Sequence, residues 1–305
     1  MARFVRNTVA GLALALAAPA MAQQQDFSKV EIKTQMIAPG VGILFGEGGN
    51  IGVSAGPDGL IIIDDQFAPL TPRIQAALKR IEDRPVRFVI NTHLHFDHTG
   101  GNENFGKAGA VIVAHDNVRK RMSGEQFMRA LNRTVPPAPA AALPVVTFSE
   151  DLSLHLNGDT LRIVHVHDSH TDGDALIKWE KANVLHTGDV FVRYGLPFVD
   201  LSSGGSINGL IAAVGTAIEM ADAETRVIPG HGALASRTDM ESYRAMLVDV
   251  RDRIAAAIAA GKTLDQIKAD NPAKKYYTGG FVNADAFATM VFESLGATAG
   301  GHAHH

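Results

Sequence analysis

The feature that most restricts the fold and chemistry of this chain is a cluster of three histidines and one aspartate within six residues. The cluster comprises His93, His95, Asp97 and His98, and it lies between an apolar, strand-like run and a Gly-Gly turn. In extended backbone, residues two apart point the same way, so His93 and His95 can reach one ion together. Asp97 and His98 follow the predicted strand, where the chain turns, and can face a second ion.

The chain has 305 residues and no cysteine, which excludes disulfides, thiolate metal sites and cysteine nucleophiles. Any metal must therefore be held by imidazole and carboxylate groups, which suit zinc and other divalent transition metals. Four polar residues can also cap a helix or face solvent. Their spacing at a strand-to-turn junction favours the metal site.

Further metal ligands are expected from other strand ends. Three candidates each follow a predicted strand and stand beside glycine or a turn residue. They are His170, Asp189 and His231, after the runs 160–166, 184–186 and 226–228. Each is weak alone, because a single loop histidine is more often a surface residue than a ligand.

The order of predicted elements indicates a layered α/β fold. Strands are expected at 30–36, 41–45, 51–55, 60–64, 87–91 and 175–179, separated by glycine-rich or Pro-Asp-Gly turns. Helices are expected at 117–132, 206–221 and 284–295, and from Thr71-Pro72 onward, with a loop at 135–144. Capping boxes at Thr238 with Glu241 and at Thr263 with Gln266 predict two more helices, the first ending near 260. A sheet sandwich covered by helices on its outer faces accounts for this order.

The N-terminus has the pattern of a secretory signal peptide. Arg3 and Arg6 precede an apolar run at 9–18, and a small-x-small site predicts cleavage after Ala22. A membrane anchor is the alternative, but the run is short for a spanning helix. We therefore expect a protein exported to a bacterial periplasm, with no membrane association in its mature form. The predicted layout is a signal peptide at 1–22, one catalytic domain at 23–295 and a flexible His-containing tail at 296–305.

The charge balance narrows the class of partner. The 28 basic and 32 acidic side chains give a formal net charge of −4, without the basic excess of a non-specific nucleic-acid binder. A small-molecule substrate is expected instead, and no nucleic acid. The sequence does not indicate an oligomeric state.

Taken together, these motifs resemble the metallo-β-lactamase superfamily over nearly the whole mature chain, about 30–295. The resemblance implies an αββα sandwich, with two mixed β-sheets flanked by helices and the metal site at one edge. It assigns a first metal to His93, His95 and His170, a second to Asp97, His98 and His231, and a bridging role to Asp189. It also implies a supporting aspartate at the end of the 60–64 strand, which is Asp64 or its neighbour Asp65.

The sequence departs from the superfamily's β-lactamases at the bridging position. Where those enzymes have a cysteine or no bridging ligand, this chain has Asp189, as in glyoxalase-II-like, lactonase-like and phosphodiesterase-like members. A lysine that often binds the β-lactam carboxylate is also replaced, by Val192 with Arg193 next to it. Arg193 either substitutes for this cation or is a solvated surface residue.

The expected function is that of a hydrolase with two zinc ions per chain, iron or manganese being the alternatives. Two divalent ions about 3.5–4 Å apart share a water and lower its pKa from about 16 toward about 7. The resulting hydroxide attacks an acyl carbonyl of a β-lactam, lactone or thioester, and Asp97 acts as the catalytic residue that orients it and accepts its proton. An iron-dependent redox enzyme and a non-catalytic metal-binding protein are the competing interpretations.

Other residues are interpreted less sharply. The turn 46–50 is either a substrate flap or an ordinary hairpin, and Tyr194 either donates a hydrogen bond to substrate or packs. His115 and His155 are expected at the surface.

Overall fold

The computed structural model describes residues 26–129 and 132–299. The predicted signal peptide and the last six residues of the predicted tail lie outside these ranges. In the described ranges, no helix has both the length and the hydrophobicity that a membrane span requires.

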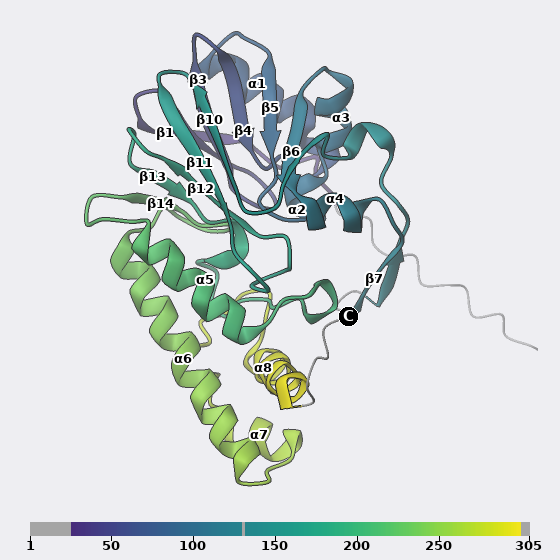
Figure 1. Ribbon diagram of the computed structural model, residues 1–305, viewed down its shortest axis with the longest axis vertical. Helices are drawn as coiled ribbons and strands as arrows, with labels where there is room; N and C mark the ends of the chain where they lie inside the picture. The colour runs from purple at the N-terminus through teal and green to yellow at the C-terminus, as the bar shows by residue number, and fades with distance from the viewer. Residues whose placement is uncertain (1–25, 130–131, 300–305) are drawn as a thin grey trace, which may run out of the picture.

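Two β-sheets form the centre of the molecule (Figure 1). The first has seven strands in the order β1-β2-β3-β4-β5-β6-β9. Their bounds are β1 Lys33–Ala38, β2 Val41–Phe45, β3 Ile51–Gly56, β4 Gly59–Ile63, β5 Val86–Ile90, β6 Val111–His115 and β9 Val146–Phe148. β1 to β4 are antiparallel neighbours, whereas β4, β5, β6 and β9 run parallel, so the sheet is mixed.

The second sheet has five strands in the order β10-β11-β12-β13-β14. Their bounds are β10 Asp151–Leu156, β11 Asp159–His165, β12 Ala175–Trp179, β13 Val184–His186 and β14 Arg226–Ile228. Only β13 and β14 are parallel. A separate two-stranded hairpin pairs β7 (Gln126–Met128) with β8 (Arg133–Val135).

Alternation of side chains along the strands explains the layers. In β4, Ile61 and Ile63 face the second sheet and pack with Ile163 and Ile177 in one buried cluster around Trp179. The intervening side chains of β4, Leu60 and Ile62, face outward and belong to a different cluster. Because successive strand residues point to opposite faces, a strand that is apolar throughout must be covered on both sides.

Helices provide that cover. The outer face of the first sheet packs against α1 (Thr71–Ile81) and α3 (Asn102–Lys107), and α2 (Phe96–Thr99) and α4 (Asp116–Met122) lie along the same sheet. The outer face of the second sheet is covered by α5 (Ile207–Glu219) and α6 (Arg237–Ala259). α8 (Ala284–Ala299) packs against these two helices, and α7 (Leu264–Asp270) packs against α8, farther from the sheet (Figure 1). The predicted αββα sandwich is therefore confirmed.

Several predicted elements need correction. The expected helix at 117–132 is only α4, because Ser123 and Gly124 end it and β7 follows. The capping box of α6 is formed by Ser236 and Asp239, not by Thr238 and Glu241, since the Ser236 side chain reaches the Asp239 amide. α1 begins at Thr71 as expected, but Thr71 does not cap it, because Leu70 occupies the cap position and makes no side-chain hydrogen bond there.

Two further differences concern strands without predicted bounds and the end of the last helix. Strands β6 and β10 were not expected from the sequence, and α8 continues to Ala299, into the predicted tail. The capping box of Thr263 and Gln266 is confirmed at α7.

Candidate metal centre

The candidate ligands come from strand ends of both sheets, at one edge of the sandwich. His93 and His95 follow β5, and Asp97 and His98 lie on α2 directly after them. The other three come from the second sheet: His170 from the β11–β12 loop, Asp189 from a short turn after β13, and His231 from the segment after β14. Carboxyl ends of parallel strands meet at the same edge, so β4 with β5 and β13 with β14 deliver these residues to one place.

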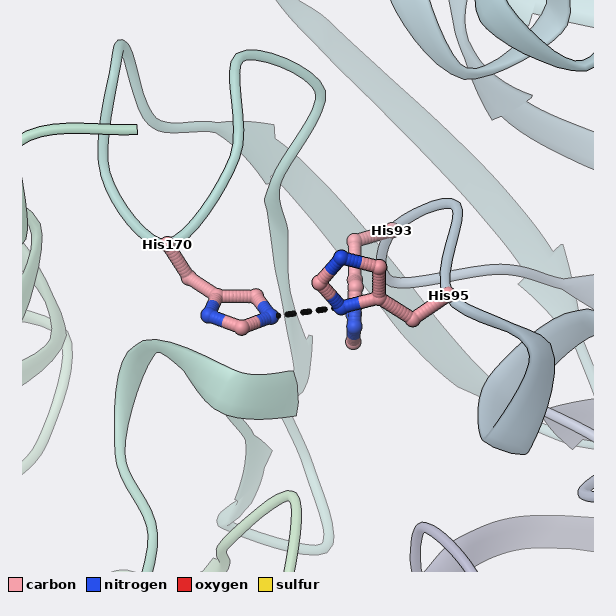
Figure 2. A group of neighbouring side chains, drawn as sticks. All are labelled: His93, His95 and His170. Atoms are coloured by element: carbon pink, nitrogen blue, oxygen red, sulfur yellow. Dashed lines mark hydrogen bonds between the residues drawn. The ribbon is translucent and has the colours of Figure 1, made fainter. Parts of the chain in front are cut away.

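The first group consists of His93, His95 and His170. Their ring centroids are 4.7–4.8 Å apart, and Nε2 of His170 lies 2.9 Å from Nδ1 of His95. Figure 2 shows the three rings converging from two separate loops. All three side chains are buried.

The second group consists of Asp97, His98 and His231. Nε2 of His231 lies 3.2 Å from an Asp97 carboxylate oxygen and 3.3 Å from Nε2 of His98. In each group the potential ligand atoms lie within 4.8 Å of one another. Asp97 and His231 are partly exposed, so this side of the centre opens to solvent.

Asp189 lies between the two groups. One of its carboxylate oxygens is 3.3 Å from Nε2 of His98, and the other is 3.8 Å from Nε2 of His170 and 3.5 Å from Nε2 of His231. This position agrees with the expected bridging role. Gly230 makes the close approach possible, because a Cβ there would lie 1.9 Å from the Asp189 carboxylate.

Four imidazoles are oriented by hydrogen bonds on the side that faces away from the centre. Nδ1 of His98 donates to Asp64, Nδ1 of His170 donates to the Phe198 carbonyl, and Nε2 of His95 donates to Asp200. Nδ1 of His93 lies 3.0 Å from the Thr92 hydroxyl, whose own proton goes to Asp64. Each imidazole is thereby left with one nitrogen lone pair directed inward, as in metal-binding histidines.

Two buried polar atoms of the centre have no hydrogen-bond partner in the described part of the chain. They are Nε2 of His93 and one carboxylate oxygen of Asp189. Unpaired buried polar groups are costly, and a bound cation would satisfy both. The donor set, imidazole and carboxylate without thiolate, fits a divalent transition metal.

The electrostatics of the centre are also those of a cation site. Burial and the neighbouring imidazoles lower the pKa of His93 well below its usual value, so this ring stays neutral with a free lone pair. Burial would raise the pKa of Asp97, but His98 and His231 lower it to about 2. Burial would lower the pKa of His231, but the Asp189 and Asp97 carboxylates raise it to about 9. This negative field would stabilise metal ions in the same way.

Asp64 and Asp65 have separate roles. Asp64 accepts hydrogen bonds from the Thr92 amide and hydroxyl at 2.8 Å and from His98 at 2.7 Å. Asp65 accepts from the Gly101 amide and so shapes the turn before α3. Asp64, rather than Asp65, is therefore the supporting aspartate, because it contacts the candidate ligand His98.

The turn 46–50 is a hairpin held over the second group. The Gly49 amide donates to the Asp97 carbonyl, and the Asn50 side chain donates to the carbonyls of Pro229 and Gly232. A Cβ on Gly49 would lie 2.3 Å from the His98 ring, so only glycine allows this contact.

Of the other residues considered in the sequence analysis, some lie beside the centre and others lie away from it. The Tyr194 ring lies 5.3 Å from the His231 ring, beside the centre. Arg193 instead donates to the Leu234 carbonyl and pairs with Asp239 at the start of α6, which agrees with its interpretation as a surface residue. His155 is exposed as expected, but the expectation for His115 is wrong: it is buried, and its ring stacks on that of His165 at 3.6 Å because β6 and β11 face each other.

Asp200 was missed by the sequence analysis. It lies just before a short turn at Leu201–Ser203 and holds His95 from outside the cluster. Its distance along the chain from His95 has no recognisable spacing, so no sequence signal would have identified it.

Comparison with known proteins identifies the family of this chain. The family model for the metallo-beta-lactamase superfamily matches residues 45–252, and the chain belongs to this superfamily of metallo-hydrolases. The chain is 27% identical over 207 residues to a hydroxyacylglutathione hydrolase from a Polaromonas species, covering 65% of this chain and 71% of that one. It is 26% identical over 182 residues to a probable metallo-hydrolase of Methanocaldococcus jannaschii, covering 58% of this chain and 84% of the relative.

Solved structures share the fold. A metallo-beta-lactamase from Pontibacter korlensis superposes with a TM-score of 0.59 at 17% identity, covering 72% of this chain and all of that one. An inverting sec-alkylsulfatase from a Pseudomonas species superposes with a TM-score of 0.64 at 18% identity, covering 86% of this chain but only 50% of the sulfatase. The family model confirms the predicted family, and these solved structures confirm the predicted fold.

Proposed function

We propose that this protein is a dinuclear zinc hydrolase that cleaves an acyl bond, with a thioester as the first candidate. The observation that carries the proposal is the position of the Asp189 carboxylate between the two groups: one oxygen lies near His98, and the other lies near both His170 and His231. A bridging carboxylate between two imidazole groups suits two ions rather than one. The hydroxyacylglutathione hydrolases among the relatives support a thioester.

The proposal assigns His93, His95 and His170 to one ion, and Asp97, His98 and His231 to the other. When bound, the two ions would supply an activated water as nucleophile and Lewis-acid polarisation of the carbonyl. Zinc is proposed because of the ligand chemistry, and iron or manganese remain compatible with it.

The chain's own groups prepare the reaction in three ways. Asp64, Asp200, Thr92 and the Phe198 carbonyl fix the orientation of the imidazoles. The Asp97 carboxylate is ionised and lies at the open side of the centre, where it can orient the attacking water and accept its proton. The hairpin at 46–50 holds the backbone of the second group in place, because the Gly49 amide donates to the Asp97 carbonyl.

A metal analysis combined with a substrate panel tests the proposal. The purified protein is assayed for bound metal by elemental analysis and for hydrolysis of a hydroxyacylglutathione thioester, small lactones and a chromogenic cephalosporin. We expect about two zinc ions per chain and thioester turnover. Asp97→Asn should lose turnover while retaining its fold, and His155→Ala is the matched control because His155 is an exposed histidine on β10.

Three outcomes would contradict the proposal. One ion per chain would reject the dinuclear site. Iron as the main metal with none of the substrates cleaved would favour a redox enzyme. Two ions without turnover, together with an Asp97→Asn variant that changes only metal affinity, would favour a metal-binding protein.

We also propose, from the sequence alone, that the protein is exported after cleavage following Ala22 and acts on a small molecule.

A further inference from the structure

A cavity of about 390 Å³ lies beside the first metal group. Its lining includes Phe198, Phe281, Val282 and Met290, so its walls are largely apolar. Phe198 lies between the cavity and the first group, because it lines the cavity and its ring centroid lies 6.0 Å from that of His95 and 5.9 Å from that of His170. The volume is in the range of small-molecule binding pockets.

Phe281 is the unusual member of this lining. Its side chain is 72% exposed, although its ring lies 6.2 Å from that of Phe198 in an edge-to-face arrangement. The backbone next to it is fixed, because Val282 pairs with Leu196 in an antiparallel bridge. Phe281 differs from an isolated exposed aromatic residue because it lines the cavity together with Phe198 and Val282, and an apolar ligand in the cavity would cover it.

The charged groups around the cavity already have partners. Arg129 and Glu293 form an ion pair at 3.4 Å, and the Asp200 carboxylate accepts hydrogen bonds from His95 and Ser202. The cavity therefore offers an occupant mainly apolar surface, with its charged lining residues paired at the edge. An aliphatic or aromatic group fits this environment better than a charged or strongly polar one.

We infer that this cavity binds the apolar acyl chain of the substrate, with Phe198 and Phe281 as its two aromatic walls. The inference rests on the proposed acyl hydrolysis and specifies its substrate class: long-chain or aryl-substituted acyl compounds rather than small polar ones. Phe281 lies outside the part of the chain that the family model matches, which ends at residue 252.

Binding of carboxylates, the acyl products of hydrolysis, tests the inference without requiring turnover. The zinc-loaded protein is titrated with acetate, butanoate and octanoate by isothermal titration calorimetry. Each fully buried methylene strengthens binding about fourfold, so even partial burial of the chain should make octanoate bind at least about tenfold more tightly than acetate.

Two variants and a control locate the effect. Phe281→Ala should remove most of the gain of octanoate over acetate, and Ala286→Phe, which fills the cavity from α8, should remove it without weakening acetate. Tyr277→Ala is the control, since Tyr277 is an exposed aromatic residue four positions earlier that does not line the cavity. Its chain-length dependence should equal that of the wild type.

The outcomes separate this inference from the proposed function. Equal affinity for acetate and octanoate, or a gain retained in both cavity variants, would overturn the inference even if short thioesters are cleaved. A gain that depends on Phe281, in a protein that cleaves no acyl substrate, would leave the cavity assignment in place and reject the proposed function.

Discussion

Asp200 accepts a hydrogen bond from Nε2 of His95 over 3.0 Å, and this contact decides which nitrogen of His95 faces the metal centre. Burial would raise the pKa of Asp200, but the hydrogen bonds from His95, Ser202 and Ser203 hold it below its usual range, so the carboxylate is ionised. With Nε2 protonated, Nδ1 carries the lone pair, and it lies 2.9 Å from Nε2 of His170.

Asp200→Ala should therefore weaken metal binding at the first group by about 10–100-fold, the usual effect of losing a carboxylate that orients a ligand histidine. Asp200→Asn should restore part of the affinity, because its amide oxygen can still accept from His95. Zinc affinity is measured by competition with a chromophoric chelator. Asp151→Ala, which changes an exposed aspartate on β10, is the control. Unchanged affinity in Asp200→Ala would show that His95 does not need this partner.

The neighbouring aspartates Asp64 and Asp65 should respond differently to the same change. Asp64→Asn removes the acceptor of His98 and places an amide group against the Thr92 hydroxyl or the His98 ring. We expect about 1–3 kcal/mol of lost stability and weaker metal binding at the second group. Asp65→Asn can still accept from the Gly101 amide and should keep both ions. Elemental analysis and chemical denaturation measure the two effects; loss of one ion in Asp65→Asn alone would reverse the assignment.

Gly49→Ala should disturb the second group without replacing any of its candidate ligands. The added Cβ would lie 2.3 Å from the His98 ring, so either the hairpin or the imidazole must move. Overpacking of this kind costs about 1–3 kcal/mol, and the displaced imidazole should lower the affinity for the second ion. Gly124→Ala, where an added Cβ meets only ordinary contact at 3.8 Å, is the control. Wild-type metal content and melting temperature in Gly49→Ala would show that the hairpin yields freely.

Removal of the metal should destabilise the protein in a way that depends on metal concentration. A ligand that binds only the folded state at about 1,000 times its Kd stabilises it by about 4 kcal/mol per site. Chelation should therefore lower the melting temperature, and added zinc should restore it in the wild type. In His95→Ala the increase on adding zinc should be smaller, because the first group has lost a ligand. An identical increase in both proteins would place the stabilising ion elsewhere.

The stacked pair of His115 and His165 should make the stability depend on pH. Burial lowers the pKa of both imidazoles, while hydrogen bonds to the carbonyls of Ser149 and Asp174 partly offset this. In the folded state the pKa of each imidazole lies below its value of about 6.5 in the unfolded state. At a pH between these two pKa values, the unfolded state therefore binds more protons than the folded state. Stability is then complete above about pH 7 and falls as the pH drops through about 6.5.

His165→Asn tests this pair, since asparagine can still donate to the Asp174 carbonyl. The loss of melting temperature between about pH 7.5 and about pH 5.5 should be smaller in this variant than in the wild type. His155→Asn, at an exposed position, should keep the wild-type loss. Equal losses in all three proteins would assign the pH dependence to other groups.

The sequence predicted those parts of the site that are local in the chain. The spacing of His93, His95, Asp97 and His98 was informative because strand and turn geometry fix which side chains face together. His170, Asp189 and His231 could be named only as strand-end residues, and their convergence depends on the packing of two sheets. Asp200 and the Phe281 wall lay beyond sequence reasoning, since long-range packing alone places them beside His95 and Phe198.

For the fold, too, some elements could be predicted from the local sequence and others could not. The apolar runs of β2, β4 and β12 were predicted because they are buried on both faces. The bounds of β10 were not predicted, although its polar residues, such as Ser153 and His155, alternate with half-buried leucines in the pattern of a strand with one solvent-facing side. The start of α6 after Ser236 was not predicted. A capping box usually has glutamate or glutamine at its third helical residue, whereas here this residue is Asp239.

The division of the candidate ligands between the two sheets has a consequence for assembly of the protein. His93, His95, Asp97 and His98 follow strands of the first sheet, whereas His170, Asp189 and His231 belong to the second. Each ion would thus need both halves of the sandwich, and neither half alone would offer a complete set. Metal uptake would come after the halves have docked, so metal content would report on completed assembly, and a chain with one half misfolded would be unable to retain its ions.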